Sequence, residues 1–195
     1  MTFEYAKYLD GKDELKDFRK KFYMPVLNGK PVIYFCGNSL GLQPVKTKSY
    51  FDQELEDWAT LGIEGHFHGK NPWLTFHKLF SASLAKIVGA KSFEVIAMNT
   101  LTTNLHLMLT TFYRPTSKRY KVITEAGSFS SDRYALSSQV KLHGLNPKKT
   151  IIELKPRKGE YTLRTEDILK QIEKHKGSLA LVMMGGVNYY TGQAF

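Results

Sequence analysis

Apolar residues recur at helical spacing in the first part of the chain. Phe51, Leu55 and Trp58 fall at i, i+4 and i+7, which predicts one apolar helix stripe after Pro44. The same spacing predicts two further helices. Their stripes are Phe76, Phe80, Leu84 and Ile87, before Gly89, and Leu101, Leu105, Met108 and Phe112, before Pro115. A short charged helix is expected at residues 13–22.

From residue 120 onward the pattern alternates between strands and helices. Strand-like segments are expected at 120–124, 150–154 and 179–184, and helices at 128–143 and 165–175. Thr165 stands where it would cap the last helix. The final strand is apolar throughout, as in a strand buried on both faces. Strands that recur with a helix between them indicate βαβ units, so we predict an α/β domain with a mainly parallel sheet.

The earlier half of the chain contributes fewer strands. Residues 32–35, after a turn at 28–31, and residues 95–98 are the two strand-like segments there. The first hundred residues are otherwise helical and predict a lead-in rather than a separate domain. We therefore divide the chain into an N-terminal segment, residues 1–45, and an incomplete large domain, residues 46–195.

Composition places the chain among globular proteins. It has 195 residues, of which 42% are hydrophobic and 24% charged. The longest near-unbroken apolar run, residues 179–187, is far shorter than the roughly 20 residues of a membrane span. The N-terminus carries acids early and has no apolar signal region, and Cys36 is the only cysteine. We expect a cytoplasmic protein with no membrane association.

The charge is strongly basic, with 28 Lys and Arg against 18 Asp and Glu, a formal net charge of +10. The densest clusters, at 16–21, 118–121 and 148–158, lack interleaved aromatic residues. They favour a solvated surface over a nucleic-acid interface. A basic binding module without catalytic activity stays an alternative.

Two helix starts have the composition of ligand sites. Residues 99–104, Asn-Thr-Leu-Thr-Thr-Asn, open a helix after a predicted strand, where free backbone N–H groups and the helix dipole suit a phosphate. Residues 128–133 follow the strand at 120–124. Phe129 there could cover a planar ring, with Asp132 as a hydrogen-bond acceptor beside it. The alternatives are a Thr-rich cap in the first case and a core Phe in the second.

Other chemistry is weakly supported. His66 and His68 lie in a loop rich in Gly and Pro with no third ligand nearby, so no metal site is expected. Neither a Walker loop nor a nucleophile elbow is present. The sequence stops just after the last predicted strand, at the edge where open α/β sheets bind ligands. We therefore expect the N-terminal portion of a longer protein.

Several segments, taken in order along the chain, carry a family resemblance. They are Tyr34-Phe-Cys-Gly-Asn-Ser-Leu-Gly-Leu-Gln-Pro44, Gly65-His66 with Pro72-Trp73, Met98-Asn-Thr-Leu-Thr-Thr-Asn-Leu-His-Leu107, Pro115-Thr-Ser-Lys-Arg-Tyr-Lys121, Phe129-Ser-Ser-Asp132, Leu142-His-Gly-Leu145 and Gly186-Val-Asn-Tyr-Tyr-Thr-Gly-Gln193. Together they resemble the kynureninases, which are pyridoxal-phosphate enzymes of fold-type I. The resemblance implies a partial fold-type I (PLP-dependent transferase-like) large domain with a helical N-terminal lead-in.

The resemblance also implies roles for single residues. Leu101 and Thr102 would bind the phosphate of pyridoxal 5′-phosphate, largely through backbone amides. Phe129 would stack on the pyridine ring. The loop completed by Ser130, Ser131 and Asp132 would join it, and Ser39 and His66 would line the substrate pocket. Gly185 departs from relatives that often carry Ser or Thr there.

The implied activity is the hydrolysis of L-kynurenine or 3-hydroxykynurenine to anthranilate or 3-hydroxyanthranilate and L-alanine. This reaction belongs to tryptophan catabolism and NAD biosynthesis. The family's Schiff-base lysine lies beyond the matched segment. No catalytic residue is therefore assigned in this chain, and the chain alone is expected to be inactive.

The resemblance further implies a homodimer acting on a small molecule. Two alternatives remain: another fold-type I enzyme, such as a cysteine desulfurase or class V aminotransferase, and a non-catalytic truncated relative. The Gly-Asn-Ser-Leu-Gly segment at 37–41 and the Gly-His pair at 65–66 argue against the first.

Overall fold

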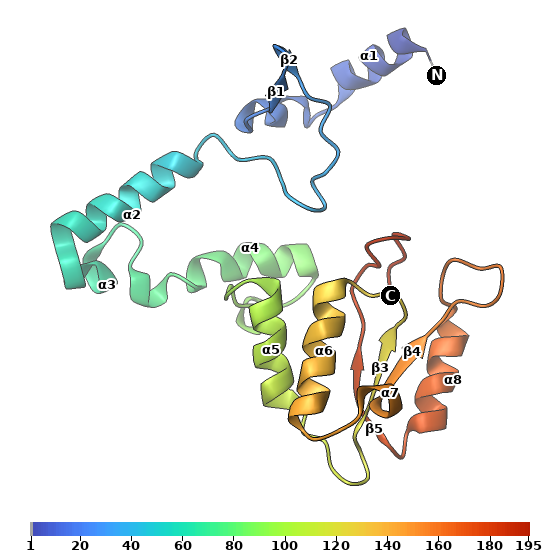
Figure 1. Ribbon diagram of the computed structural model, residues 1–195. Coiled ribbons are helices and arrows are strands. Elements are labelled where there is room, and N and C mark those ends of the chain that lie inside the picture. Colours follow the sequence, from blue (N-terminus) through green and yellow to red (C-terminus); the bar gives the residue numbers. More distant parts are fainter. Residues whose placement is uncertain (1) are drawn as a thin grey trace. The chain divides into compact units, whose positions relative to one another are not determined.

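A computed structural model describes residues 2–195 (Figure 1). Contacts within the chain divide it into two units, Met1–Ala97 and Met98–Phe195. The predicted boundary between residues 45 and 46 stays a prediction. No helix in the described part of the chain has both the length and the apolar character needed to cross a membrane.

The second unit contains the sheet. Its strands are β3 (Lys121–Glu125), β4 (Ile151–Leu154) and β5 (Leu179–Met183). They lie in the order β4-β3-β5, and both pairings are parallel. Helix α6 (Ser130–Leu142) and the short α7 (Pro147–Thr150) connect β3 to β4, and α8 (Thr165–His175) connects β4 to β5. The predicted βαβ units and parallel sheet are confirmed.

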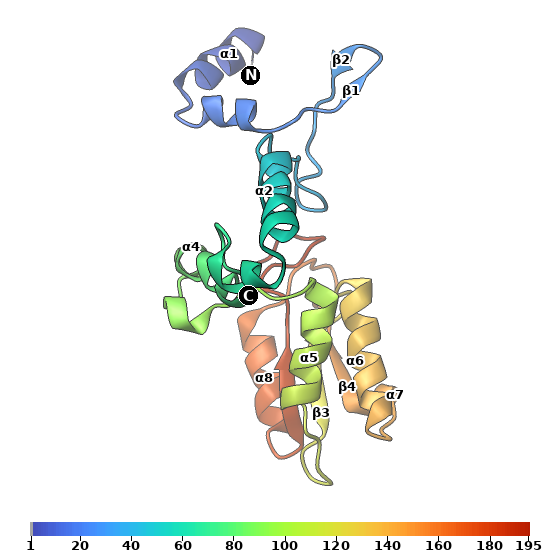
Figure 2. The same ribbon diagram turned by 90° about the vertical axis from the view of Figure 1, so that its left-hand side faces the viewer.

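Helices cover both faces of this sheet. Helices α5 (Leu101–Phe112) and α6 lie side by side on one face, as both views show (Figures 1 and 2). Their core includes Val122, Leu136 and Val140, each at most 1% exposed. On the other face, Ile168 and Ile172 of α8 pack against Ile123, Leu154 and Leu163. Each fully buried aliphatic side chain of this kind contributes about 1.5–3 kcal/mol.

Two details of the α/β pattern differ from the prediction. Strand β5 is not buried on both faces, because Val182 is 41% exposed. Strand β5 forms an edge of the described sheet. The hydrophobic cluster under α8 includes none of its central residues, 180–182. Thr165 does not cap α8, because Arg164 occupies the cap position and no side chain accepts a hydrogen bond there.

The first unit is built mostly of short helices. They are α1 (Phe3–Lys12), η1 (Lys16–Lys21), α2 (Thr47–Leu61), η2 (Gly62–Glu64), α3 (Gly65–His68), η3 (Trp73–Thr75), α4 (Lys78–Val88) and η4 (Ser92–Glu94). The helices predicted around Trp58 and Phe80 are confirmed, and α4 ends at Gly89, whose φ is 70°. The charged helix expected at 13–22 is a shorter 3-10 helix.

The two strands predicted in this half are wrong. Asn28 and Gly29, with φ of 51° and 73°, turn a short hairpin between β1 (Val26–Leu27) and β2 (Lys30–Pro31). The turn is therefore confirmed, but pairing ends at Pro31, and residues 32–35 join no ladder in the described chain. Val95 is extended, yet no described strand pairs with residues 95–98. An apolar run forms a strand only where a neighbouring strand takes its hydrogen bonds.

Candidate functional site

The second unit gathers its helix starts at one edge of the sheet. All three strands run parallel, so their carboxyl ends meet at that edge. Helices α5, α6 and α8 begin at the same end (Figure 1). Free backbone N–H groups and the positive ends of helix dipoles therefore converge there.

The start of α5 is held open rather than capped. Thr100 precedes the helix with φ −66° and ψ 159°, and its side chain makes no cap hydrogen bond. Its hydroxyl lies 3.1 Å from that of Thr103 instead. The side chain of Asn104 fixes the segment that leads into α5. Its Oδ1 accepts from the backbone N–H of Asn99 at 3.1 Å, and its Nδ2 donates to the carbonyl of Asn99 at 3.0 Å.

This arrangement leaves the first turn of α5 available to a ligand. Within residues 2–195, no acceptor takes the backbone N–H groups of Leu101 and Thr102. Both residues are exposed, and Leu101 is 71% exposed. The alternative of a Thr side-chain cap is therefore not what the structure contains.

The start of α6 presents an exposed aromatic ring. Phe129 occupies the cap position with φ −55° and ψ 142° and is 51% exposed, so it is not a core residue. Ser130, Ser131 and Asp132 form the first turn. The hydroxyl of Ser131 donates to Asp132 Oδ1 at 3.1 Å. An acidic residue in the first turn complements the helix dipole.

The loop after β5 reaches the same ring. Tyr189 meets Phe129 edge to face, with ring centroids 5.2 Å apart and planes at 85°. Next to it, Asn188 Nδ2 donates to Glu125 Oε2 at 2.7 Å. Glu125 ends β3 and is 5% exposed. A cavity of about 360 Å³ at this edge is lined by Glu125, Asn188 and Tyr189, among others.

Sequence reasoning missed Glu125 and Asn188. The available signal was an acid as the last residue of a buried strand, since such a position is rarely acidic unless the carboxylate has a partner. Its partner lies 63 positions away, so spacing alone did not suggest the pair.

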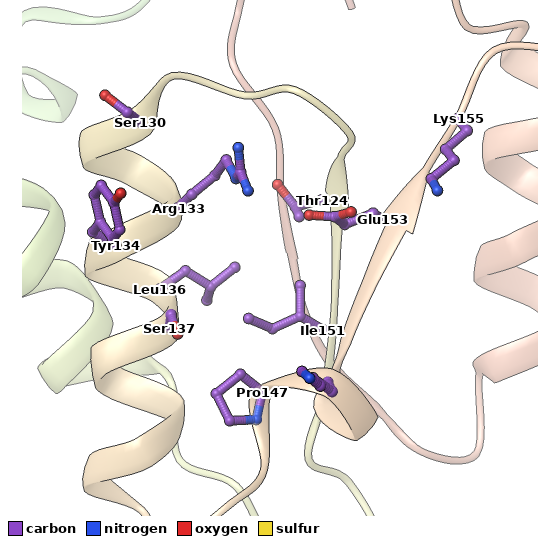
Figure 3. A pocket seen from close by; sticks show the side chains of 11 residues that line it. Thr124, Ser130, Arg133, Tyr134, Leu136, Ser137, Pro147, Ile151, Glu153 and Lys155 are labelled. Atoms are coloured by element: carbon purple, nitrogen blue, oxygen red, sulfur yellow. The ribbon is translucent and has the colours of Figure 1, made fainter.

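A larger cavity, of about 570 Å³, lies between α6 and β4 (Figure 3). Figure 3 shows Leu136 and Ile151 facing each other across it, with Pro147 beyond them, and Arg133 on the side of Thr124. Of the predicted site residues only Ser130 lines it. The cavity therefore reaches the start of α6 through Ser130, but Leu101, Thr102 and Phe129 are not in its lining.

Ser39 and His66 belong to the first unit. Ser39 lies in an exposed turn, where its backbone N–H donates to Cys36 O at 2.9 Å. His66 lies in α3 and meets the Trp73 ring edge-on, with centroids 5.3 Å apart. Leu101, Thr102 and residues 129–132, by contrast, all lie in the second unit.

Two carboxylates of α2 bind the segment that directly follows α3, the short helix that contains His66. Glu54 accepts hydrogen bonds from Trp73 Nε1 at 2.9 Å and Asn71 Nδ2 at 2.8 Å. Asp57, 7% exposed, accepts from the backbone N–H of Lys70 at 2.9 Å. These bonds hold residues 70–73 against α2, so the position of the neighbouring His66 is set within the first unit.

Ionisable groups near the sheet edge form a surface ion-pair cluster. The hydrogen bond from Arg157 lowers the pKa of Asp167, and the bond from Arg164 lowers the pKa of Glu160. These exposed pairs connect the loop after β4 to the first turn of α8. Among residues 2–195, no group of three or more His, Cys, Asp or Glu side chains is arranged to hold a metal ion.

Comparison with known proteins gives a consistent set of relatives. Kynureninase of Myxococcus xanthus is 56% identical over 192 residues, covering 98% of this chain and 45% of that protein. Kynureninase of Flavobacterium psychrophilum is 54% identical over 194 residues, covering 46% of its length. Human kynureninase is 46% identical over 202 residues, covering 97% of this chain and 43% of the human protein. The chain thus spans less than half the length of the curated relatives it matches. No protein-family model matches it.

Proposed function

Because this chain belongs to the kynureninase family, we propose that it binds pyridoxal 5′-phosphate and forms the cofactor-holding part of a kynurenine hydrolase. The whole enzyme would cleave L-kynurenine or 3-hydroxykynurenine to anthranilate or 3-hydroxyanthranilate and L-alanine. That reaction serves tryptophan catabolism and NAD biosynthesis.

The phosphate fits the first turn of α5. The backbone N–H groups of Leu101 and Thr102 are exposed and have no acceptor within the described chain, which is the arrangement that an anion occupies at a helix start. This is the single observation that carries the proposal. The neighbouring start of α6 adds a second set of free N–H groups, from Ser130 and Ser131.

The pyridine ring fits against Phe129. The ring of Phe129 is half exposed and meets the Tyr189 ring edge to face, so its exposed part is available for stacking. Asp132 keeps acceptor capacity beyond its bond to Ser131 and is placed to take a donor of the cofactor.

The bound cofactor supplies an electron sink for a carbanion on the amino-acid substrate. The residues of this chain bind and orient: Leu101 and Thr102 hold the phosphate, and Phe129 sets the plane of the ring. Ser39 and His66 are proposed to line the substrate pocket. The lysine that binds the cofactor covalently is not assigned to any residue of this chain.

Assembly and location form part of the same proposal. We expect a cytosolic homodimer that uses neither a membrane nor nucleic acid. The exposed apolar side chains of the first unit, including Trp58 at 64% and Phe35 at 89%, support an association surface. The lone cysteine, Cys36, suits a reducing compartment.

The phosphate site is tested by Leu101→Pro. Leu101 is the first residue of α5, where proline is tolerated because that N–H has no partner within the helix. Thr100 already has the extended backbone that a following proline requires. The variant removes one free amide and leaves the helix intact. We expect cofactor affinity, measured by fluorescence titration, to fall about tenfold, since a hydrogen bond to a charged group contributes about 1.5–3 kcal/mol.

The matched control is Thr165→Pro. Thr165 is the first residue of α8, and Arg164 before it is also extended. The control removes the same backbone N–H group at a helix start with no proposed ligand, so its cofactor affinity should equal that of the wild type. Equal affinity in Leu101→Pro and the wild type, with unchanged helix content, would refute the phosphate site. Anthranilate fluorescence after addition of kynurenine to the full-length enzyme tests the reaction itself.

A further inference from the structure

The carboxylate of Glu125 is buried without an opposite charge. It is 5% exposed, and no Lys, Arg or His forms an ion pair with it among residues 2–195. Its one hydrogen-bond donor is Asn188 Nδ2, at 2.7 Å. Burying a charge is costly unless the group is hydrogen-bonded. The position of Glu125 therefore calls for a role that an apolar residue at the end of β3 would not fill.

Asn188 uses its other side-chain atom to hold the loop after β5. Its Oδ1 accepts from the backbone N–H groups of Tyr190 at 3.0 Å and Thr191 at 2.9 Å, and from Thr191 Oγ1 at 3.1 Å. The side chain of Asn188 is thus fixed at both ends, on β3 through Glu125 and on the turn through three donors. The residue is 9% exposed.

A second amide fastens the far end of the same loop. Gln193 Oε1 accepts from Leu163 N at 2.8 Å, and its Nε2 donates to Leu163 O at 2.6 Å. The backbone N–H of Asn188 donates to Gln193 O at 2.8 Å. The turn is therefore tied to two other segments, and Tyr189, which directly follows Asn188, lies between the two fixed points.

Tyr189 in turn packs against Phe129, so the position of Tyr189 affects that of Phe129. The two rings meet edge to face at 5.2 Å. Gly185 lies next to the Glu125 carboxylate, where an added Cβ would stand 3.3 Å from Oε1. A glycine at that point leaves the carboxylate room to face Asn188. Glu125, Asn188, Tyr189 and Phe129 form a continuous series of contacts from the end of β3 to the start of α6.

We propose that Glu125 and Asn188 are positioning residues that hold Tyr189 against Phe129 and thereby fix the aromatic surface on which a planar ring ligand stacks. The inference rests on the proposed function, since it takes pyridoxal 5′-phosphate as that ligand. The proposed role requires no contact of either residue with the cofactor. Their effect reaches it through the hydrogen bond between them and through the two aromatic rings.

The test compares Glu125→Ala, Asn188→Ala and Glu125→Gln in the full chain. Glutamine keeps an oxygen that accepts from Asn188 Nδ2 but removes the charge. The two alanine variants should weaken pyridoxal-phosphate binding about tenfold, the loss expected for a broken buried hydrogen bond, and should alter the circular dichroism band of the bound cofactor. Glu125→Gln should restore both to near wild-type values. The control is Glu153→Gln, an exposed acid on β4 opposite Thr124, which should change neither.

The outcomes separate this inference from the proposed function. Wild-type protein that does not bind pyridoxal phosphate defeats the proposed function and the inference with it. If the wild type binds and Phe129→Leu binds weakly, but both alanine variants keep wild-type affinity and dichroism, only the positioning role is overturned. A Glu125→Gln variant as weak as Glu125→Ala also overturns it. Should Glu125→Ala fail to fold, as judged by far-ultraviolet dichroism, Asn188→Ala and Glu125→Gln decide the matter.

Discussion

The two units of this chain are each stabilised by different interactions. In the second unit, nine hydrophobic side chains are buried, and Val122, Ile123 and Val140 are fully inaccessible. In the described part of the first unit, Ala85 is the one buried hydrophobic residue. The one buried polar residue of that part is Asp57. The second unit therefore has a core that can stabilise it, whereas the first depends on helix hydrogen bonds and on polar contacts.

Those polar contacts are concentrated at one place. Glu54 and Asp57 of α2 hold the loop at 65–73, and Gly65 packs directly under the Trp73 ring. The apolar stripe of α2 is left exposed, with Phe51 at 67%, Leu55 at 57% and Trp58 at 64%. An exposed stripe on this scale marks a surface that another surface covers. A segment can thus have well-formed helices and an ordered loop without having its own hydrophobic core.

Hydrogen exchange should show the contrast most strongly. The amides of β3 and the middle of α6 should be protected by several orders of magnitude, since they open only with the core of the second unit. The amides of residues 26–36 should exchange at rates near those of an unfolded chain. Mass spectrometry of the deuterated protein measures both. Comparable protection in the two regions would show that the difference in burial has no counterpart in stability.

A pair of leucine truncations should show the next largest effect. Leu136 is 1% exposed within the core of the second unit, and Leu136→Ala should cost about 3 kcal/mol. Leu55→Ala, on the exposed stripe of α2, should change stability by no more than about 0.5 kcal/mol. Urea unfolding followed by circular dichroism at 222 nm measures both. A large loss from Leu55→Ala would show that the α2 stripe is buried against another surface in solution.

Gly65→Ala tests the polar loop of the first unit. A Cβ at this position would lie 2.6 Å from the nearest atom of the Trp73 ring, so the ring must move. Overpacking of this kind costs about 1–3 kcal/mol. We expect a changed near-ultraviolet dichroism and tryptophan emission, with the second unit unaffected. The matched control is Gly11→Ala in α1, which has nothing within 4 Å and should leave both signals unchanged.

The smallest expected effect is the pH dependence of the ion pairs on the second unit. Arginine partners lower the pKa of both Asp167 and Glu160. Acids with a lowered pKa in the folded state stabilise it above their ordinary values, and this contribution is lost as the pH falls through the folded-state pKa. Arg157→Gln should therefore be slightly less stable than the wild type at pH 7. The difference in urea midpoint should narrow below about pH 4, and a difference that persists at pH 2 would contradict this account.

Local sequence pattern predicted most of the second unit. Helices α5, α6 and α8 and strands β3, β4 and β5 were all expected near their observed bounds, because apolar periodicity and glycine stops act over a few residues. The same reasoning reached the helix starts at Leu101 and Phe129, since their position depends only on where a strand ends and a helix begins. The kynureninase resemblance read from ordered segments is confirmed by relatives of 46–56% identity.

The errors in strand pairing and strand burial have a common cause. Residues 32–35 and 95–98 have strand-like composition, yet neither finds a partner strand within residues 2–195. The apolar run of β5 predicts burial on both faces, but Val182 stays exposed because burial depends on what packs above it. Strand pairing and burial are relations between distant segments, and a local pattern contains no information on them.

The sequence by itself determined where the helices of the second unit start, and it supplied the prediction that two of those starts take an anion and a ring, because both inferences depend only on neighbouring residues. Only the tertiary structure placed Asn188 against Glu125 across 63 positions and Tyr189 against Phe129 across 60. The parallel sheet brings the ends of β3 and β5 together, and that juxtaposition turns an acid and an amide into one hydrogen-bonded pair.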